Sequence, residues 1–309
     1  MSTKTVKAVI NGVEYNLTKN ESTGKWEASI PAPAASSWNQ DDHKFNVQLT
    51  ATNEAGTSKT IDRTDSTFGS ELALRVLEKQ KPVITLTSPG SGAYITTATP
   101  TIIALLKDSA IGGNGDSGID LTSIVLKIDG VTVSSSDSGI SVEPIDGGYK
   151  CTYTPATGLS EGNHTITIDV SDNDGNAAEQ AVCTFKVDTV PPTLNITAPA
   201  DNFITNKQTL TVEGITNDTT STPVTVSIKL NGSDTGTVTV GADGSFSKEI
   251  TLAEGTNTIV VTATDAAGKA STVTKTVEYD SSVPIFKSVS LTPNPVDAGA
   301  TLTLVVEVE

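Results

Sequence analysis

The chain has 309 residues, with 20 lysine or arginine against 36 aspartate or glutamate, so its formal net charge is −16. This acidity argues against nucleic acids and anionic membrane surfaces as partners, because both attract basic patches. No apolar run reaches the roughly 18 residues that a membrane-spanning helix needs, so no membrane insertion is expected. The threonine- and valine-rich composition instead favours a β-rich chain of two or three domains.

Three copies of one strand pattern follow one another along the chain. Each copy has a short strand that ends in an Asn-Gly or Asp-Gly turn, at residues 11–12, 129–130 and 231–232. Each also has a later strand that ends in a small polar hairpin, at residues 49–58, 168–177 and 261–270. Alternation of apolar and polar residues, with turn dipeptides between the runs, predicts an all-β chain of antiparallel sandwiches.

The copies differ in how complete they are. The second and third begin with a strand that ends in proline, so we expect whole sandwich domains over 82–191 and 192–283. Residues 1–81 match only the later strands of the pattern, with 69–80 as the expected closing strand, and 284–309 match only its first two strands. Short joints that end in proline predict that the domains form an extended rod.

The segments "KPVITLTSPGSGAYI", "SIVLKIDGVTV", "DTVPPTLNITAP" and "EGTNTIVVTATDAAGKAS" carry a family resemblance. They resemble the bacterial Ig-like (Big-type) repeats found in tandem in surface proteins and in prophage tail and virion proteins of Gram-positive bacteria. The resemblance covers nearly all of residues 82–280 and is weaker over 1–81. It implies tandem Ig-like β-sandwiches with roles in adhesion, spacing or virion structure. It carries over no catalytic residue.

The residues needed for catalysis are scarce in this chain. Its two histidines, His43 and His164, align with each other in the repeats and are interpreted as polar residues at a strand edge. Clustered cysteine and histidine for zinc are absent, and no glycine-rich loop that could hold a phosphate precedes a helix. We therefore expect a protein that is not an enzyme and has neither catalytic nor cofactor-binding residues.

Calcium is the one metal that the sequence brings into consideration. Two acidic loops, "KDSAIGGNGDSGID" and "SDNDGN", supply the oxygen ligands that hard cations prefer. The candidate ligands in these loops are Asp108, Asp116, Asp120, Asp172 and Asp174. Tight turns use the same residues to cap the backbone, which is the competing interpretation. The matching hairpins "TNEAG" and "TDAAG" are poorer in oxygen ligands, which favours turn chemistry.

Cys151 and Cys183 both alternate in phase with apolar neighbours, so both are expected to point into one core. Two buried thiols are the favoured interpretation, and a disulfide across the sandwich is the alternative. Trp26 and Trp38 occupy positions where other copies carry core hydrophobic residues. Core packing is therefore favoured over stacking on a sugar, although a bacterial surface glycan stays open as a partner.

The incomplete first and last segments predict assembly. Leu302, Leu304, Val306 and Val308 alternate onto one face of the last strand. Strand addition could let residues 284–309 of one copy complete residues 1–81 of another, which gives a ring or a filament. The alternatives are an atypical but complete first domain, or a further domain whose remainder lies beyond this sequence.

These observations lead first to a structural or adhesive protein of a phage virion or phage-tail-like particle, made in the cytoplasm without a signal peptide. Its expected partners are copies of itself or other virion and tail proteins. The alternatives are a bacterial surface adhesin or stalk, and accessory domains of a secreted glycoside hydrolase. Either alternative would place the chain outside the cell.

Overall fold

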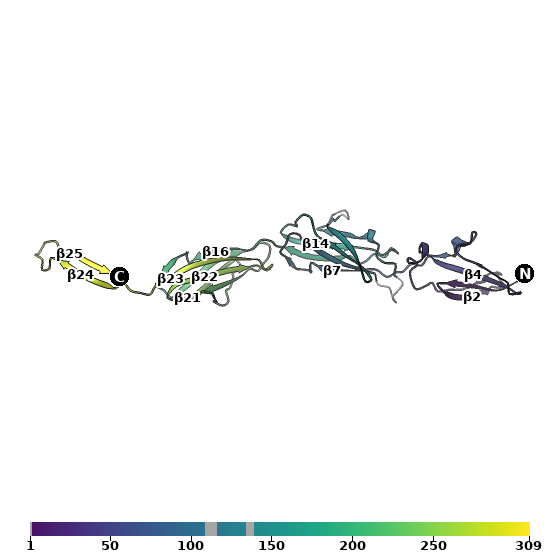
Figure 1. Ribbon diagram of the computed structural model, residues 1–309, viewed down its shortest axis with the longest axis horizontal. Coiled ribbons are helices and arrows are strands. Elements are labelled where there is room, and N and C mark those ends of the chain that lie inside the picture. Colours follow the sequence, from purple (N-terminus) through teal and green to yellow (C-terminus); the bar gives the residue numbers. More distant parts are fainter. Residues whose placement is uncertain (1, 109–115, 134–138) are drawn as a thin grey trace. The chain divides into compact units, whose positions relative to one another are not determined.

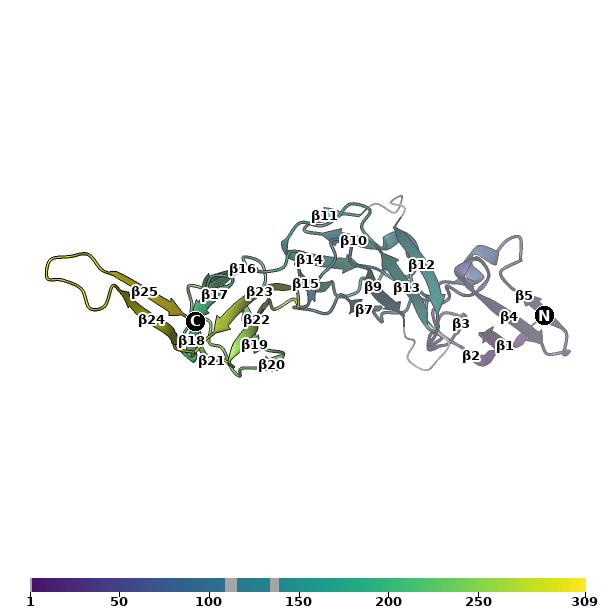
Figure 2. The ribbon, with the colours of Figure 1, turned by 60° about the vertical axis from the view of Figure 1, so that its left-hand side comes forward.

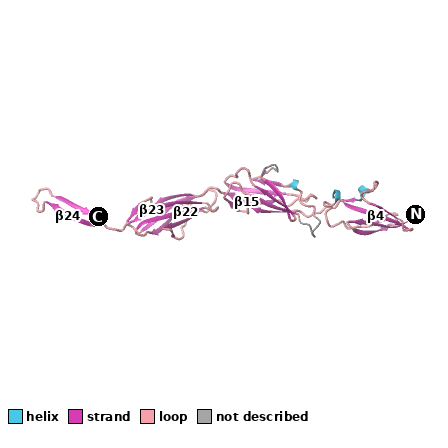
Figure 3. Cartoon of the chain, in the orientation of Figure 1, coloured by secondary structure: helices cyan, strands magenta, loops and turns pink. Residues whose placement is uncertain are grey.

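The computed structural model describes residues 2–108, 116–133 and 139–309. These residues are almost entirely strands and loops, with three short 3-10 turns at Asp41–His43, Gly69–Leu72 and Leu121–Ser123 (Figure 3). No helix among the described residues is both long and apolar enough to cross a membrane. The chain divides into two compact units, residues 1–187 and 188–309. Each sheet stays within one of the four segments expected from the repeats.

Residues 2–81 form a single antiparallel sheet in the order β3-β2-β1-β4-β5, with β6 beside β4 (Figure 1). Its strands are β1 (Thr3–Ile10), β2 (Val13–Lys19), β3 (Trp26–Glu27), β4 (Phe45–Asn53), β5 (Ser58–Ile61) and β6 (Ala73–Leu74). Few apolar side chains are buried here, namely Ala8, Ile10, Phe45 and Leu72. The expectation of a closing strand over 69–80 is wrong for most of that range. The segment forms the 3-10 turn Gly69–Leu72, followed by β6, which has only two residues.

The next domain is a sandwich of two sheets, β11-β10-β14-β15-β8 and β12-β13-β9-β7 (Figure 2). Its strands are β7 (Val83–Ser88), β8 (Tyr94–Ile95), β9 (Ile102–Lys107), β10 (Val125–Ile128), β11 (Val131–Thr132), β12 (Ile140–Ile145), β13 (Gly148–Tyr153), β14 (Gly162–Asp169) and β15 (Ala181–Val187). Alternate residues of β9, β13, β14 and β15 form one core between the sheets. Cys151 and Cys183 are both buried in this core as free thiols, which confirms the favoured interpretation.

The second unit repeats this plan with the sheets β16-β18-β21 and β17-β23-β22-β19-β20 around their own core. The strands are β16 (Thr193–Ala198), β17 (Phe203–Thr205), β18 (Thr209–Asn217), β19 (Thr225–Leu230), β20 (Ser233–Asp234), β21 (Ser245–Thr251), β22 (Gly255–Thr264) and β23 (Ala270–Tyr279). In both sandwiches a short strand after the opening one, β8 or β17, pairs in parallel with the last strand.

The last two strands, β24 (Phe286–Thr292) and β25 (Thr303–Val308), pair only with each other. Their register places Leu291 opposite Leu304 and Val289 opposite Val306. This matches the opening strands of the second domain, where β7 pairs with β9 in the same antiparallel way. The hairpin therefore has the form of the first two strands of a sandwich domain.

Candidate metal centres

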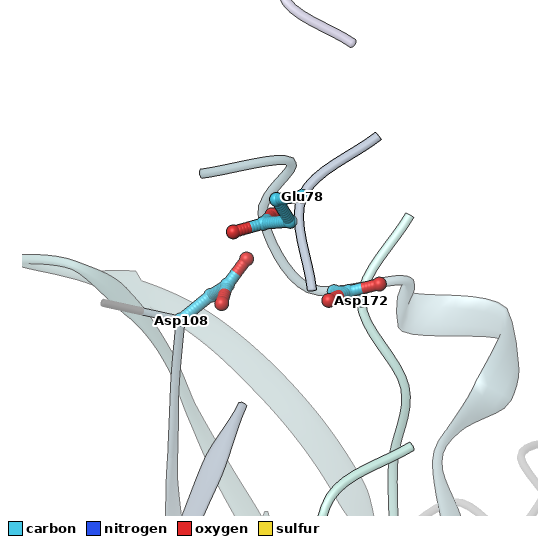
Figure 4. A group of neighbouring side chains, drawn as sticks. All are labelled: Glu78, Asp108 and Asp172. Carbon is cyan, nitrogen blue, oxygen red and sulfur yellow. The ribbon is translucent and has the colours of Figure 1, made fainter. Parts of the chain in front are cut away.

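Three carboxylates from separate stretches of the first unit meet at one place, which we call the first carboxylate cluster (Figure 4). Glu78 lies in the segment that leads into β7, Asp108 directly follows β9, and Asp172 lies in the hairpin between β14 and β15. One oxygen from each residue lies within 4.8 Å of one oxygen from each of the others. The two sheets each position one of these carboxylates, because β9 of one sheet ends directly before Asp108 and β14 of the other ends shortly before Asp172.

Two of the three carboxylates in the first cluster are buried, and Glu78 is half-buried. Asp108 is 3% exposed and Asp172 is 1% exposed. Both oxygens of Asp172 accept hydrogen bonds from Asn176, at 2.8 Å from the backbone N–H and 2.7 Å from Nδ2. Oδ2 of Asp108 accepts from the N–H of Gly118 at 2.9 Å, whereas its Oδ1 is buried with no hydrogen-bond partner. Burial, followed by the charge of Glu78, raises the pKa of Asp108 to about 6.

The second unit contains a matching group, the second carboxylate cluster, formed by Asp188, Asp218 and Asp265. Its oxygens also lie within 4.8 Å of one another. Asp188 accepts a hydrogen bond from the hydroxyl of Ser221 and is fully buried, and Oδ1 of Asp218 accepts from the Ser221 N–H at 2.7 Å. Oδ1 of Asp265 accepts from the N–H of Lys269 at 2.8 Å, and its buried Oδ2 has no partner.

The two clusters occupy equivalent places in their domains. Each combines one carboxylate from the segment that enters the domain, one directly after the strand β9 or β18, and one from the hairpin after β14 or β22. Among the described residues, no lysine, arginine or histidine forms an ion pair with any of the six. The corresponding hairpin residue of the first segment is the neutral Asn53, whose Oδ1 accepts from Ala55 and Thr57.

Two of the five calcium candidates from the sequence, Asp108 and Asp172, come together in the first cluster. The others have different contacts. Asp120 caps a 3-10 turn through the Thr122 N–H, and Oδ2 of Asp174 accepts from the Ser36 hydroxyl at 2.5 Å and the Glu78 N–H at 3.0 Å. Asp116 lies outside the cluster, although its charge also raises the pKa of Asp108.

Four members of the clusters are not among the candidates from the sequence, namely Glu78, Asp188, Asp218 and Asp265. The hairpin "TDAAG" was judged poor in oxygen ligands, yet a cluster takes only one carboxylate from each hairpin. Aligning Asp265 with Asp172, and noting an acidic residue in each segment that enters a domain, would have indicated both clusters.

The histidines do not form a catalytic arrangement. His164 is buried in β14, where its ring nitrogens lie 2.7 Å from Oδ2 of Asp129 and 2.8 Å from the carbonyl of Ser160. His43 lies in a 3-10 turn before β4 and stacks on Trp38 with ring centroids 3.9 Å apart. His164 therefore lies near the start of its strand, as expected, although it is buried, whereas His43 lies two residues before β4 begins. Neither imidazole is hydrogen-bonded to a serine hydroxyl or a cysteine thiol in the described part of the chain.

The residues expected to serve assembly lie on the exposed hairpin. The register of β24 and β25 makes Leu304 equivalent to Ala104 and Val306 equivalent to Leu106, both of which are fully buried in the second domain. In the hairpin, however, Leu304 is 57% exposed and Val306 is 40% exposed. Leu302 and Val308 are exposed as well. A face that is core elsewhere in this chain is thus uncovered here.

Comparison with known proteins identifies the domains. Residues 116–189 match the family described as bacterial Ig-like domain, and residues 192–281 match the family described as glucodextranase, domain B. The two sandwich domains are thus tandem Ig-like domains. The resemblance drawn from the sequence and the all-β fold class are therefore confirmed.

Individual relatives of these Ig-like domains cover the chain to different extents. Bacillopeptidase F of Bacillus subtilis is 35% identical over 127 residues, which are 41% of this chain and 8% of that protein. The chain thus spans a small part of that relative. The fibronectin(III)-like modules of Clostridium thermocellum CbhA are 18% identical, with 64% of this chain and 94% of that chain covered and a TM-score of 0.39. Sidekick-1 immunoglobulin domains 1–5 are 13% identical, with coverages of 99% and 60% and a TM-score of 0.40.

Proposed function

We propose that these Ig-like domains form a non-catalytic segment of a larger bacterial protein that acts outside the cell, where they serve as a spacer or stalk. One observation carries the proposal: the matched sequences are parts of larger proteins. The match to bacillopeptidase F takes up 8% of that protein, and the other family is named as one domain of glucodextranase. None of these descriptions refers to a phage, so the virion interpretation gains no support from them.

The aromatic side chains favour a spacer over a sugar-binding module. A sugar-stacking platform needs an exposed aromatic face, but Trp38 is half-buried and its ring stacks on His43. Trp26 is also half-buried, in the short strand β3. The core position expected for both tryptophans is therefore only partly reached.

Binding measurements on the whole chain test this proposal. We expect no retention on insoluble dextran, starch or peptidoglycan, and no release of products from a glucan or from casein. Saturable retention on one polysaccharide that Trp38→Ala abolishes and Trp26→Ala leaves unchanged would establish a sugar-binding module instead. Turnover of either substrate by the purified chain would overturn the non-catalytic assignment.

A second candidate function is head-to-tail assembly by strand complementation, and the hairpin β24–β25 supports it. Residues 2–81 contribute one sheet, whose strands β1, β2, β4 and β5 correspond to β10, β11, β14 and β15. The hairpin corresponds to strands of the opposite sheet and exposes the apolar face that this sheet normally buries. We propose that the hairpin of one copy covers the sheet of residues 2–81 in a second copy.

A further inference from the structure

We propose that each carboxylate cluster binds one calcium ion, which joins the segment entering the domain to two loops of that domain. The cation would have carboxylate ligands from Glu78, Asp108 and Asp172 in the first unit. In the second unit the corresponding ligands are Asp188, Asp218 and Asp265. This property is independent of the spacer function proposed above.

Charge is the first reason. Three carboxylates within 4.8 Å repel one another, and burial increases the repulsion because the interior screens charges poorly. No basic side chain among the described residues neutralises either group. Buried charges in proteins are paired or coordinate metals. A cation at the centre of each group would supply the missing positive charge.

The unpartnered oxygens are the second reason, and they are independent of the first. Oδ1 of Asp108 and Oδ2 of Asp265 are among only three buried side-chain atoms of the described residues that lack a hydrogen-bond partner. A buried acceptor without a partner costs about 1–3 kcal/mol, so a native protein rarely leaves one unused. Each cluster contains one of these oxygens, on the residue after β9 in the first and on the hairpin residue after β22 in the second, which is what one ligand vacancy per domain predicts.

The ligand chemistry selects the cation. All six side chains offer oxygen only, which suits calcium or magnesium and excludes a zinc preference. Two oxygens that bind one calcium ion at about 2.3–2.6 Å can be at most roughly 5 Å apart, and the 4.8 Å limit in each cluster fits this geometry. Ligands from three separate segments of the chain suit calcium, which tolerates irregular shells of about 6–8 oxygens, better than the strictly octahedral magnesium.

A bound proton is the alternative way to reduce the negative charge of a cluster, since two close carboxylates can share one proton. A calcium ion and a shared proton predict different effects of an isosteric Asp→Asn substitution. Asp108→Asn and Asp265→Asn each replace the unpartnered oxygen by an amide that can donate to the neighbouring carboxylates. Such variants should be as stable as the metal-free parent or more stable, and they should lose the calcium site of their own domain only.

The test uses the whole chain, stripped with a chelator, in isothermal titration calorimetry with calcium chloride. We expect two calcium ions per chain for the parent, one for Asp108→Asn, one for Asp265→Asn and none for the double variant. Asp243→Asn, in an exposed turn outside the clusters, removes the same charge and should still bind two. Differential scanning calorimetry should show an upward Tm shift of roughly 10 °C at about 100 times the Kd.

Specific results would overturn the proposal. No calcium heat and no Tm shift at millimolar calcium would mean that protons neutralise the clusters. Binding that survives in the double variant would place the calcium elsewhere, and equal Tm shifts from magnesium and calcium would remove the assignment of the cation. Because a stable Asn variant is expected in the absence of calcium, loss of binding there cannot be ascribed to unfolding.

Discussion

At the scale of single residues, the two buried thiols show how packing controls reactivity. Burial raises the pKa of both Cys151 and Cys183, so the thiolate is scarce in the folded protein. We predict that the native chain at pH 8 releases almost no thionitrobenzoate from Ellman's reagent over minutes. After unfolding in guanidinium chloride, two thiols per chain should react. A chain with no thiols after unfolding would contain the disulfide that the structure lacks.

Two different side chains, His164 and Asn257, have the same role at aligned positions of the second and third repeats. His164 contacts Asp129 of the Asp-Gly turn, and the aligned Asn257 accepts a hydrogen bond from Asn231 of the Asn-Gly turn at 3.0 Å. Both turn residues also accept from the backbone N–H that follows the buried polar residue, that of Thr165 in the second domain and that of Thr258 in the third. The buried polar residue therefore holds the turn against the long central strand.

This arrangement predicts the effects of substitution at His164. His164→Ala should lower the free energy of unfolding by about 2–3 kcal/mol, because it leaves a cavity and removes two hydrogen bonds. His164→Asn should cost less, since asparagine serves the same position in the third copy. The matched control His43→Ala lies outside a core and should cost less than about 1 kcal/mol. Urea unfolding followed by far-UV circular dichroism measures all three, and an unchanged midpoint for His164→Ala would contradict the argument.

At the scale of elements, the segment between β6 and β7 should respond to calcium. Lys79 is exposed beside Glu78, which is a proposed ligand, so trypsin can cleave after Lys79 only when this segment detaches. We predict that saturating calcium slows cleavage at Lys79 roughly tenfold or more, because local opening must release the ion. Mass spectrometry of the fragments measures the rate. Asp108→Asn should abolish the protection and Asp265→Asn should preserve it.

The strands were predictable from the sequence to a degree that the elements themselves explain. The strand expected before the turn at 231–232 is β19, and the strands expected to end at the hairpins 168–177 and 261–270 are β14 and β22. Each of these strands buries one face in a sandwich, so its side chains alternate. The segment 69–80 has no such two-sided environment, and there the expectation failed.

Only two of the six cluster residues were predictable from the sequence, for a different reason. Asp108 and Asp172 stand in loops rich in oxygen ligands, which a local pattern can indicate. Glu78 joins them only because the chain enters the domain beside these loops. This contact brings together Glu78 and Asp172, which are 94 positions apart in the sequence. Turn chemistry also uses aspartate, as at Asp120, so residue type alone cannot separate a ligand from a cap.

At the scale of the whole molecule, the proposed assembly would depend on the exposed face of the hairpin. If the hairpin of one copy covers residues 2–81 of another, the buried side of β25 should contain Leu304 and Val306, and its outer side Val305. Val306→Glu would then place a charge in an apolar interface, whereas Val305→Glu would place it in water. Both residues are exposed in the single chain, so neither substitution should unfold it.

We therefore predict that the chain forms species larger than a monomer in sedimentation velocity at tens of micromolar. Deleting residues 284–309, or introducing Val306→Glu, should leave only monomer. Val305→Glu should sediment like the parent, which separates burial of one face from a general effect of added charge. A monomeric parent over the whole concentration range would exclude complementation between copies and leave the spacer function unaffected, because that proposal rests on the matched domains rather than on the hairpin.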